Sequence, residues 1–271
     1  MHIGRELPLD APGGDDIANV GFIAGKKCVA VIDTGGSAKV GRALRTAVRE
    51  RTALPVCYVI NTHVHVDHVL GNAAFKAGGA RFVGHRALAA AIDRNRKFFL
   101  EEYRADLDPP PSAAQIIGPD LLVERRLTLD LGNRLLHLRA WSPAHTDCDL
   151  TVYDAKTRTL WTGDLVFRER LPALDGSVTG WLAALDELKR MHIDVVVPGH
   201  GPAGRDLAAA IAPQRRYLQA LADGVRDALA RNETPEEAIA HVGTAEKPRW
   251  LLWEGTHARN VLRAYGELEW E

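Results

Sequence analysis

Four side chains that commonly bind metal ions fall within six residues of this chain, in the run HVHVDH formed by His63, His65, Asp67 and His68. The run follows the apolar stretch PVCYVI, so it begins where a buried strand ends and a loop can turn side chains into a cleft. Imidazole and carboxylate groups packed this closely would repel one another or lack partners unless a cation lay between them. Zinc prefers His nitrogen and accepts carboxylate oxygen. The run therefore predicts a metal site rather than an ordinary polar surface loop.

Three further segments place a possible ligand directly after a strand-like run. They are SPAHTD with His145, WTGD with Asp164 and VPGH with His200. Each segment is a weak signal alone, because a single histidine after a strand is usually an ordinary surface or core residue. In this order, and combined with the HVHVDH run, the three segments form a specific pattern.

The chain alternates strand-like and helix-like segments in two halves. In the first half, NVGFIAG, KKCVAVID and PVCYVI are typical of buried strands, and Ser37 is expected to cap a helix. In the second half, strand pairs flank short turns, and a helix carrying Trp181 precedes DVVVPGH. Two such halves predict an α/β fold in which two sheets form a sandwich with helices on the outside, in four layers ordered αββα.

The last third reads as helical, with a capping box expected at Thr234. We expect residues 1–204 to form the αββα domain and residues 205–271 to form a C-terminal helical extension packed on it. Trp250 and Trp253 are interpreted as core residues of this extension. A predicted helix from Arg86 to about Tyr103 is followed by a proline-rich loop, which fits either a flap over a pocket or a plain connection.

Composition narrows the possible partners and location of the protein. The 271 residues include 46% apolar and 25% charged residues, as in soluble globular proteins, and the net charge is −1. We expect a small-molecule substrate and no nucleic acid, which usually needs a basic excess. No segment is long and apolar enough to predict a membrane span. The N-terminus lacks a signal-peptide pattern, which predicts a cytoplasmic protein by default, or a periplasmic one if a leader was removed. Nothing indicates an oligomeric state.

The cysteines are sparse and odd in number, which argues against a disulfide framework. Cys28 and Cys57 lie within apolar runs and are interpreted as core residues. Cys148 lies close to His145 in sequence, but we do not expect it to be a ligand because the ligand set is complete without it.

The ordered series HxHxDH, H, GD, GH resembles the metallo-β-lactamase superfamily over roughly residues 17–204. The chain is more specifically similar to the quinoprotein relay system zinc metallohydrolases. The segments that carry this similarity are AVIDTGG, NTHVHVDHVLGNAAF, AHTDCDLTVYD, LWTGDLVF, LDGSVTGWLAALDEL, VVPGHGP and RNVLRAYGELEWE. The resemblance implies the αββα fold, and it does not name a substrate.

The resemblance also implies a ligand set for two zinc ions, with iron or manganese as alternatives. His63, His65 and His145 would hold one ion; Asp67, His68 and His200 would hold the other; and Asp164 would bridge them. This is the set of dinuclear hydrolases such as glyoxalase II. It differs from the β-lactamases with a cysteine ligand, because Asp164 stands where their thiolate would be.

The expected activity is hydrolysis of an ester, thioester, lactone or amide by a metal-activated hydroxide. Asp67 and Asp164 are the expected catalytic residues, with Asp67 also orienting the nucleophile or carrying a proton. Asp33 is expected to support a ligand histidine from outside. His85 and His257 are candidate pocket residues, although a histidine in such a position is more often an ordinary surface residue.

Two other functions fit the same residues. Persulfide dioxygenases share the HxHxDH motif and use a single iron held by two histidines and an aspartate, which would correspond to His63, His145 and Asp164. A non-catalytic metal-binding relay protein is the second alternative. The complete seven-ligand set disfavours it, because a structural zinc site is normally closed and single.

Overall fold

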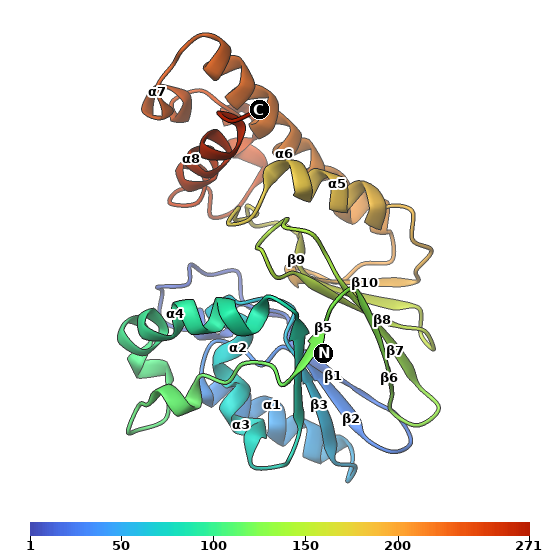
Figure 1. Ribbon diagram of the computed structural model, residues 1–271. Coiled ribbons are helices and arrows are strands. Elements are labelled where there is room, and N and C mark those ends of the chain that lie inside the picture. The colour runs from blue at the N-terminus through green and yellow to red at the C-terminus, as the bar shows by residue number, and fades with distance from the viewer.

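The computed structural model describes residues 1–271, and its centre is a pair of five-stranded sheets packed face to face (Figure 1). The first sheet has the order β1-β2-β3-β4-β5 and the second has the order β10-β9-β8-β7-β6. The strands of the first sheet are β1 Gly21–Ala24, β2 Val29–Ile32, β3 Val56–Ile60, β4 Arg81–His85 and β5 Leu121–Val123. Those of the second are β6 Arg126–Asp130, β7 Leu135–Ala140, β8 Leu150–Asp154, β9 Thr159–Phe167 and β10 Val195–His200.

Helices cover the outer face of each sheet, which gives the predicted αββα order (Figure 1). Beside the first sheet lie α1 Ala38–Arg51, α2 Val66–Val69, α3 Ala73–Lys76 and α4 Leu88–Glu102. Beside the second lie α5 Val178–Leu188 and α6 Leu207–Ala230, while α7 Pro235–Ile239 and α8 His257–Leu268 pack on α6 and on each other. Short 3₁₀ helices occupy Gly14–Asp16, Leu70–Asn72, Arg104–Asp106, Ala113–Gln115 and Thr244–Arg249. No helix combines the length and the apolar character needed to cross a bilayer.

The two covered faces of the first sheet explain why its strand β2 is apolar throughout. Strands β2 to β5 run parallel, and β2 is buried at every position. Ile32 and Ile60 belong to the cluster between the sheets, together with Leu136 of β7. Val31 belongs to a separate cluster that includes Leu44 of α1. A parallel strand that is covered on both sides reads as a continuous apolar run rather than an alternating one.

Capping residues begin the helices where the sequence predicts. Ser37 accepts a hydrogen bond from the Val40 amide at the start of α1. Thr234 and Glu237 form the expected capping box of α7, with Pro235 in its first turn. Each cap satisfies backbone amides that have no partner within the helix.

The helices after residue 204 share one hydrophobic cluster with the second sheet and α5. This cluster has 30 buried residues, and Trp250 and Trp253 belong to it, as expected. Gln214 of α6 donates to the Leu165 carbonyl at 3.0 Å and accepts from the Phe167 amide at 2.7 Å, so α6 is fastened to the end of β9. The expected boundary at residue 204 falls just before α6, and apolar packing is continuous across it.

The cysteines differ from expectation. Cys28 and Cys57 do pack in the core between the sheets, but they form a disulfide. Cys28 immediately precedes β2 and Cys57 lies on the neighbouring strand β3, which places their Cα atoms 5.7 Å apart, a normal distance for a bridged pair. The pairing was not predictable from spacing, because it depends on which strands become neighbours. Cys148 is free and buried, and burial raises the pKa of its thiol.

We therefore expect one reactive thiol per denatured chain before reduction, that of Cys148, and three reactive thiols per chain after reduction. A thiol-specific chromophoric reagent in guanidinium chloride measures both numbers on the same sample. A Cys148→Ala variant is the control and should show none before reduction. Three reactive thiols in the unreduced protein, prepared without reductant, would show that the bridge does not form.

Candidate metal centre

Two groups of potential ligands meet at the ends of strands from both sheets. The ligand atoms of His63, His65, His145 and Asp164 lie within 4.8 Å of one another, and so do those of Asp67, His68 and His200. The structure thus brings all seven predicted ligands together. Residues of the first half of the chain supply four of them, and residues of the second half supply three.

Asp164 lies between the two groups. Its Oδ2 atom is 3.6 Å from His63 Nε2, 3.4 Å from His145 Nε2 and 3.3 Å from His200 Nε2. Its Oδ1 atom is 3.2 Å from His68 Nε2. A single carboxylate therefore contacts histidines of both groups, which is the position of a bridging ligand.

Two glycines allow β9 and β10 to lie close to each other and to the loop that follows β3. Gly163, next to Asp164, has a φ of +49°, and a Cβ atom there would lie 2.5 Å from Thr62. Gly199, next to His200, lies so close to Asp164 that a Cβ atom would overlap its carboxylate. The glycines of the GD and GH motifs are required because β9 and β10 approach each other and the β3 loop more closely than a side chain permits.

The polar atoms at the centre lack partners of their own. His63 Nε2, His68 Nε2 and Asp164 Oδ1 are buried and accept or donate no hydrogen bond. His65 Nδ1 and His145 Nε2 point at each other across 3.0 Å. Buried polar groups without partners are costly, and a metal cation between these atoms would satisfy them. The donor set of imidazole nitrogen and carboxylate oxygen therefore fits metal ions.

The electrostatics of the centre favour a cation. Burial alone would raise the pKa of Asp164, but His200, His68 and His63 hold it well below its ordinary value. Burial would also raise the pKa of Asp67, but the neighbouring histidines outweigh burial and hold that pKa well below its ordinary value. Burial lowers the pKa of His68, yet the carboxylates around it raise that pKa well above its ordinary value. The centre thus holds ionised carboxylates that attract positive charge, which metal ions would supply.

Each candidate ligand histidine is held from outside through its second ring nitrogen. His68 Nδ1 lies 2.9 Å from Asp33, the residue expected to play this part. His63 Nδ1 lies 3.0 Å from the Thr62 hydroxyl, which itself donates to Asp33 at 2.8 Å. His145 and His200 donate to backbone carbonyls, those of Ala173 at 2.7 Å and Ile17 at 2.9 Å. Such contacts fix the ring orientation and leave the inner nitrogen free to bind a metal.

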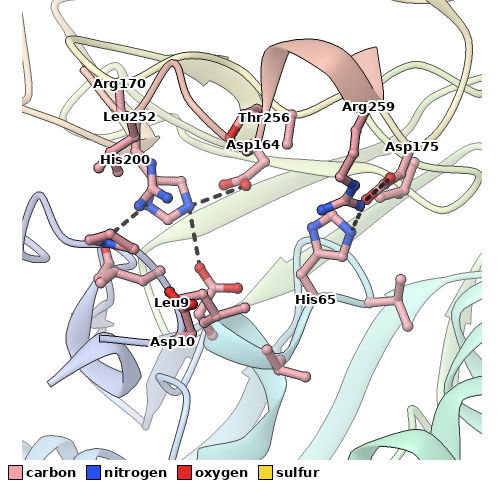
Figure 2. Close-up of a pocket in the computed structure, with 18 of the residues that line it drawn as sticks. Leu9, Asp10, His65, Asp164, Arg170, Asp175, His200, Leu252, Thr256 and Arg259 are labelled. Carbon is pink, nitrogen blue, oxygen red and sulfur yellow. Dashed lines mark hydrogen bonds and ion pairs between the residues drawn. The ribbon is translucent and has the colours of Figure 1, made fainter. Parts of the chain in front are cut away.

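His65 has an outer partner that sequence reasoning missed. Its Nε2 atom lies 2.9 Å from the Asp175 carboxylate, and Arg259 of α8 contacts the same carboxylate at 3.2 Å (Figure 2). The sequence separates Asp175 from His65 by more than a hundred residues, and its only signal is its place in the LDGSVTGW segment. Asp175 leaves His65 Nδ1 facing the other ligands.

Two predicted pocket residues lie elsewhere. His85, at the end of β4, contacts the Trp141 carbonyl at 3.1 Å through Nε2 and accepts from the Ala87 amide through Nδ1. His257 stacks on Trp253 within the C-terminal helices and contacts the Val242 carbonyl at 2.9 Å. Both imidazoles satisfy buried backbone groups, and neither lines the cavity above the metal centre.

A cavity of about 1000 Å³ opens onto the centre. Its lining includes His65, Asp67, Asp164 and His200, along with aromatic residues of α4. Further lining comes from Leu9 and Asp10 of the N-terminal segment and from Leu252 and Thr256, which precede α8. Figure 2 shows Leu252 beside His200 and Thr256 near Asp164. The proline-rich loop after Tyr103 contributes nothing to the lining, so it is a connection in this structure rather than a flap.

Comparison with solved structures finds proteins of the same fold. The sec-alkylsulfatase Pisa1 from Pseudomonas sp. matches with a TM-score of 0.72 and 18% identity, over 93% of this chain and 47% of that one. This chain thus spans about half the length of the alkylsulfatase. A metallo-β-lactamase from Pontibacter korlensis matches with a TM-score of 0.61 and 23% identity, over 73% of this chain and 85% of that one.

A metallo-β-lactamase family protein from Thermus thermophilus matches almost end to end, over 97% of this chain and 90% of that one, with a TM-score of 0.66 and 21% identity. At these identities the likeness concerns the fold. The sequence model of the metallo-β-lactamase superfamily matches residues 13–200, well over half of the chain. The protein therefore belongs to the metallo-β-lactamase superfamily, as the order of its histidines and aspartates predicts.

Proposed function

We propose that this protein is a dinuclear zinc-dependent hydrolase that acts on an ester, thioester, lactone or amide. The observation that carries the proposal is the position of Asp164, whose carboxylate contacts His63 and His145 of one group and His68 and His200 of the other. A carboxylate so placed suits two metal ions that share a ligand. Two of the similar structures bear the names of hydrolases, an alkylsulfatase and a metallo-β-lactamase, which supports the reaction class.

The residues around the centre suit hydrolysis. When bound, metal ions of this kind lower the pKa of a coordinated water to about 7 and polarise a carbonyl oxygen. Asp67 lines the cavity and has its Oδ2 atom 3.3 Å from His200 Nε2 and 3.5 Å from His68 Nε2. We assign Asp67 to orienting the attacking water and accepting its proton, in addition to binding metal.

The second ligand group weighs against a mononuclear iron dioxygenase. Such an enzyme needs only His63, His145 and Asp164. Here His200, which lies outside the HxHxDH motif that those enzymes share, is also buried with its Nε2 atom 3.3 Å from the Asp164 carboxylate. A non-catalytic relay role is disfavoured because the centre opens into a large cavity, whereas structural zinc sites are closed.

His200→Ala and His68→Ala should each lower the hydrolysis of an activated 4-nitrophenyl ester or a lactone by at least about a hundredfold. Each substitution would remove one of the few ligands of the second ion. A metal ion contributes several kcal/mol to transition-state stabilisation, and a loss of about 1.4 kcal/mol lowers the rate tenfold. His137→Ala, a substitution of an exposed histidine on β7, is the matched control and should leave the rate unchanged. Oxygen uptake with a persulfide that requires iron and persists in His200→Ala would favour the dioxygenase instead.

Asp175→Asn should weaken binding of the metal held by His65 by about 10- to 100-fold, the usual effect of losing an outer-shell partner. Competition with a chromophoric chelator measures this affinity without reference to turnover. Asp147→Asn is the control, because Asp147 is an aspartate that lines the same cavity and pairs with Arg94 rather than with a candidate ligand histidine. Equal metal affinity in wild type and Asp175→Asn would show that Asp175 does not support the site.

A further inference from the structure

Four arginines line the cavity, and Arg170 alone has no oxygen acceptor for its guanidinium. Arg94 and Arg259 pair with aspartates at 2.7 and 3.2 Å, and Arg263 donates to a backbone carbonyl at 3.1 Å. Arg170 forms no ion pair within 4.0 Å; the carboxylate that senses its charge is that of Glu6, whose pKa burial raises and the Arg170 charge opposes. An arginine carries five N–H donors and keeps its charge at all physiological pH values, so the half-buried Arg170 has donors available to an anion that enters the cavity.

The one polar side-chain contact of Arg170 cannot satisfy it. Its Nη1 atom lies 3.3 Å from His200 Nδ1. That nitrogen lies 2.9 Å from the Ile17 carbonyl, so it carries the ring proton and donates to that oxygen. His200 Nε2, on the opposite side of the ring, is the nitrogen that faces Asp164. With its Nδ1 lone pair unavailable, His200 offers no acceptor to the guanidinium.

The backbone holds Arg170 firmly in this place. The Leu171 amide donates to the Leu251 carbonyl at 2.9 Å, and the Leu251 amide donates to the Glu169 carbonyl at 2.8 Å. Glu169 and Leu252 flank this bridge with φ values of 71° and 57°. Such left-handed conformations are unfavourable for these residue types and tend to occur at ligand-binding segments. Figure 2 shows Arg170, Leu252 and His200 together on one side of the cavity.

We propose that Arg170 binds a carboxylate of the substrate, so that the protein hydrolyses an acyl compound with a free carboxylate a few bonds from the scissile group. The inference rests on the proposed hydrolase function. The planar guanidinium fork matches a carboxylate and binds it through two parallel hydrogen bonds. One imidazole ring, that of His200, separates Arg170 from Asp164. The substrate chain would therefore extend from the centre past His200, with Leu252 beside it.

Two esters of equal chain length test the proposal: the mono-4-nitrophenyl ester of glutaric acid, which has a free carboxylate, and 4-nitrophenyl pentanoate, which has none. Arg170→Gln should lower kcat/KM for the glutarate ester by about 10- to 100-fold, mainly through KM, because a hydrogen-bonded charge is lost. The pentanoate rate and the metal content should stay within about twofold. Arg94→Gln, which removes the same charge from another part of the same cavity lining, should change neither ester by more than about threefold.

Equal losses on both esters in Arg170→Gln would overturn the proposal and show that Arg170 merely supports His200. An unchanged preference between the esters would overturn it too. Calorimetric titration with glutarate, and with pentanoate as reference, tests the site without turnover. If the metal-loaded wild type hydrolyses neither ester, the expected substrates are wrong. In that case, weaker glutarate binding by Arg170→Gln than by wild type would still support the carboxylate site, and equal binding would refute it.

Discussion

The contacts of the Asp164 carboxylate with four imidazoles, at 3.2 to 3.6 Å, are the interaction on which this structure depends. Polar groups this buried need partners, and here they have mainly one another. Metal ions at this point would join loops from both sheets, because the histidines arrive from the end of β3, from the turn between β7 and β8, and from the end of β10. The binding free energy of such ions would then also stabilise the fold.

The outer contacts of the histidines distribute the support of the centre along the whole chain. They come from the N-terminal segment at Ile17, the turn at Asp33 and the segment from Ala173 to Asp175. The last of these is held by α8, where Asn260 donates to the Pro172 carbonyl at 2.7 Å and accepts from the Leu174 amide at 2.9 Å. The C-terminal helices therefore position two histidines of the centre, in addition to forming one side of the cavity.

The fold and the clustering of the seven candidate ligands were predictable because their signals are local. The HVHVDH run and the glycine before His200 each report a strand end in a few residues, whereas Asp164, expected at a strand end, lies within β9, which continues to Phe167. The Cys28–Cys57 bridge, the contact of Asp175 with His65 and the unpaired state of Arg170 were not predictable. Each depends on which distant segments become neighbours, and no local pattern encodes that. His85 and His257 were expected as possible pocket residues, but they bind buried backbone carbonyls instead. A histidine is equally suited to that role, and its local sequence does not distinguish the two.

The most direct test of the account is the number and position of metal ions in the purified protein. Crystals grown with zinc and measured on both sides of the zinc absorption edge would locate them. The account predicts two anomalous peaks, one near His63, His65 and His145 and one near Asp67, His68 and His200, with the Asp164 carboxylate between them. A single peak that remains single in excess zinc would contradict the dinuclear site.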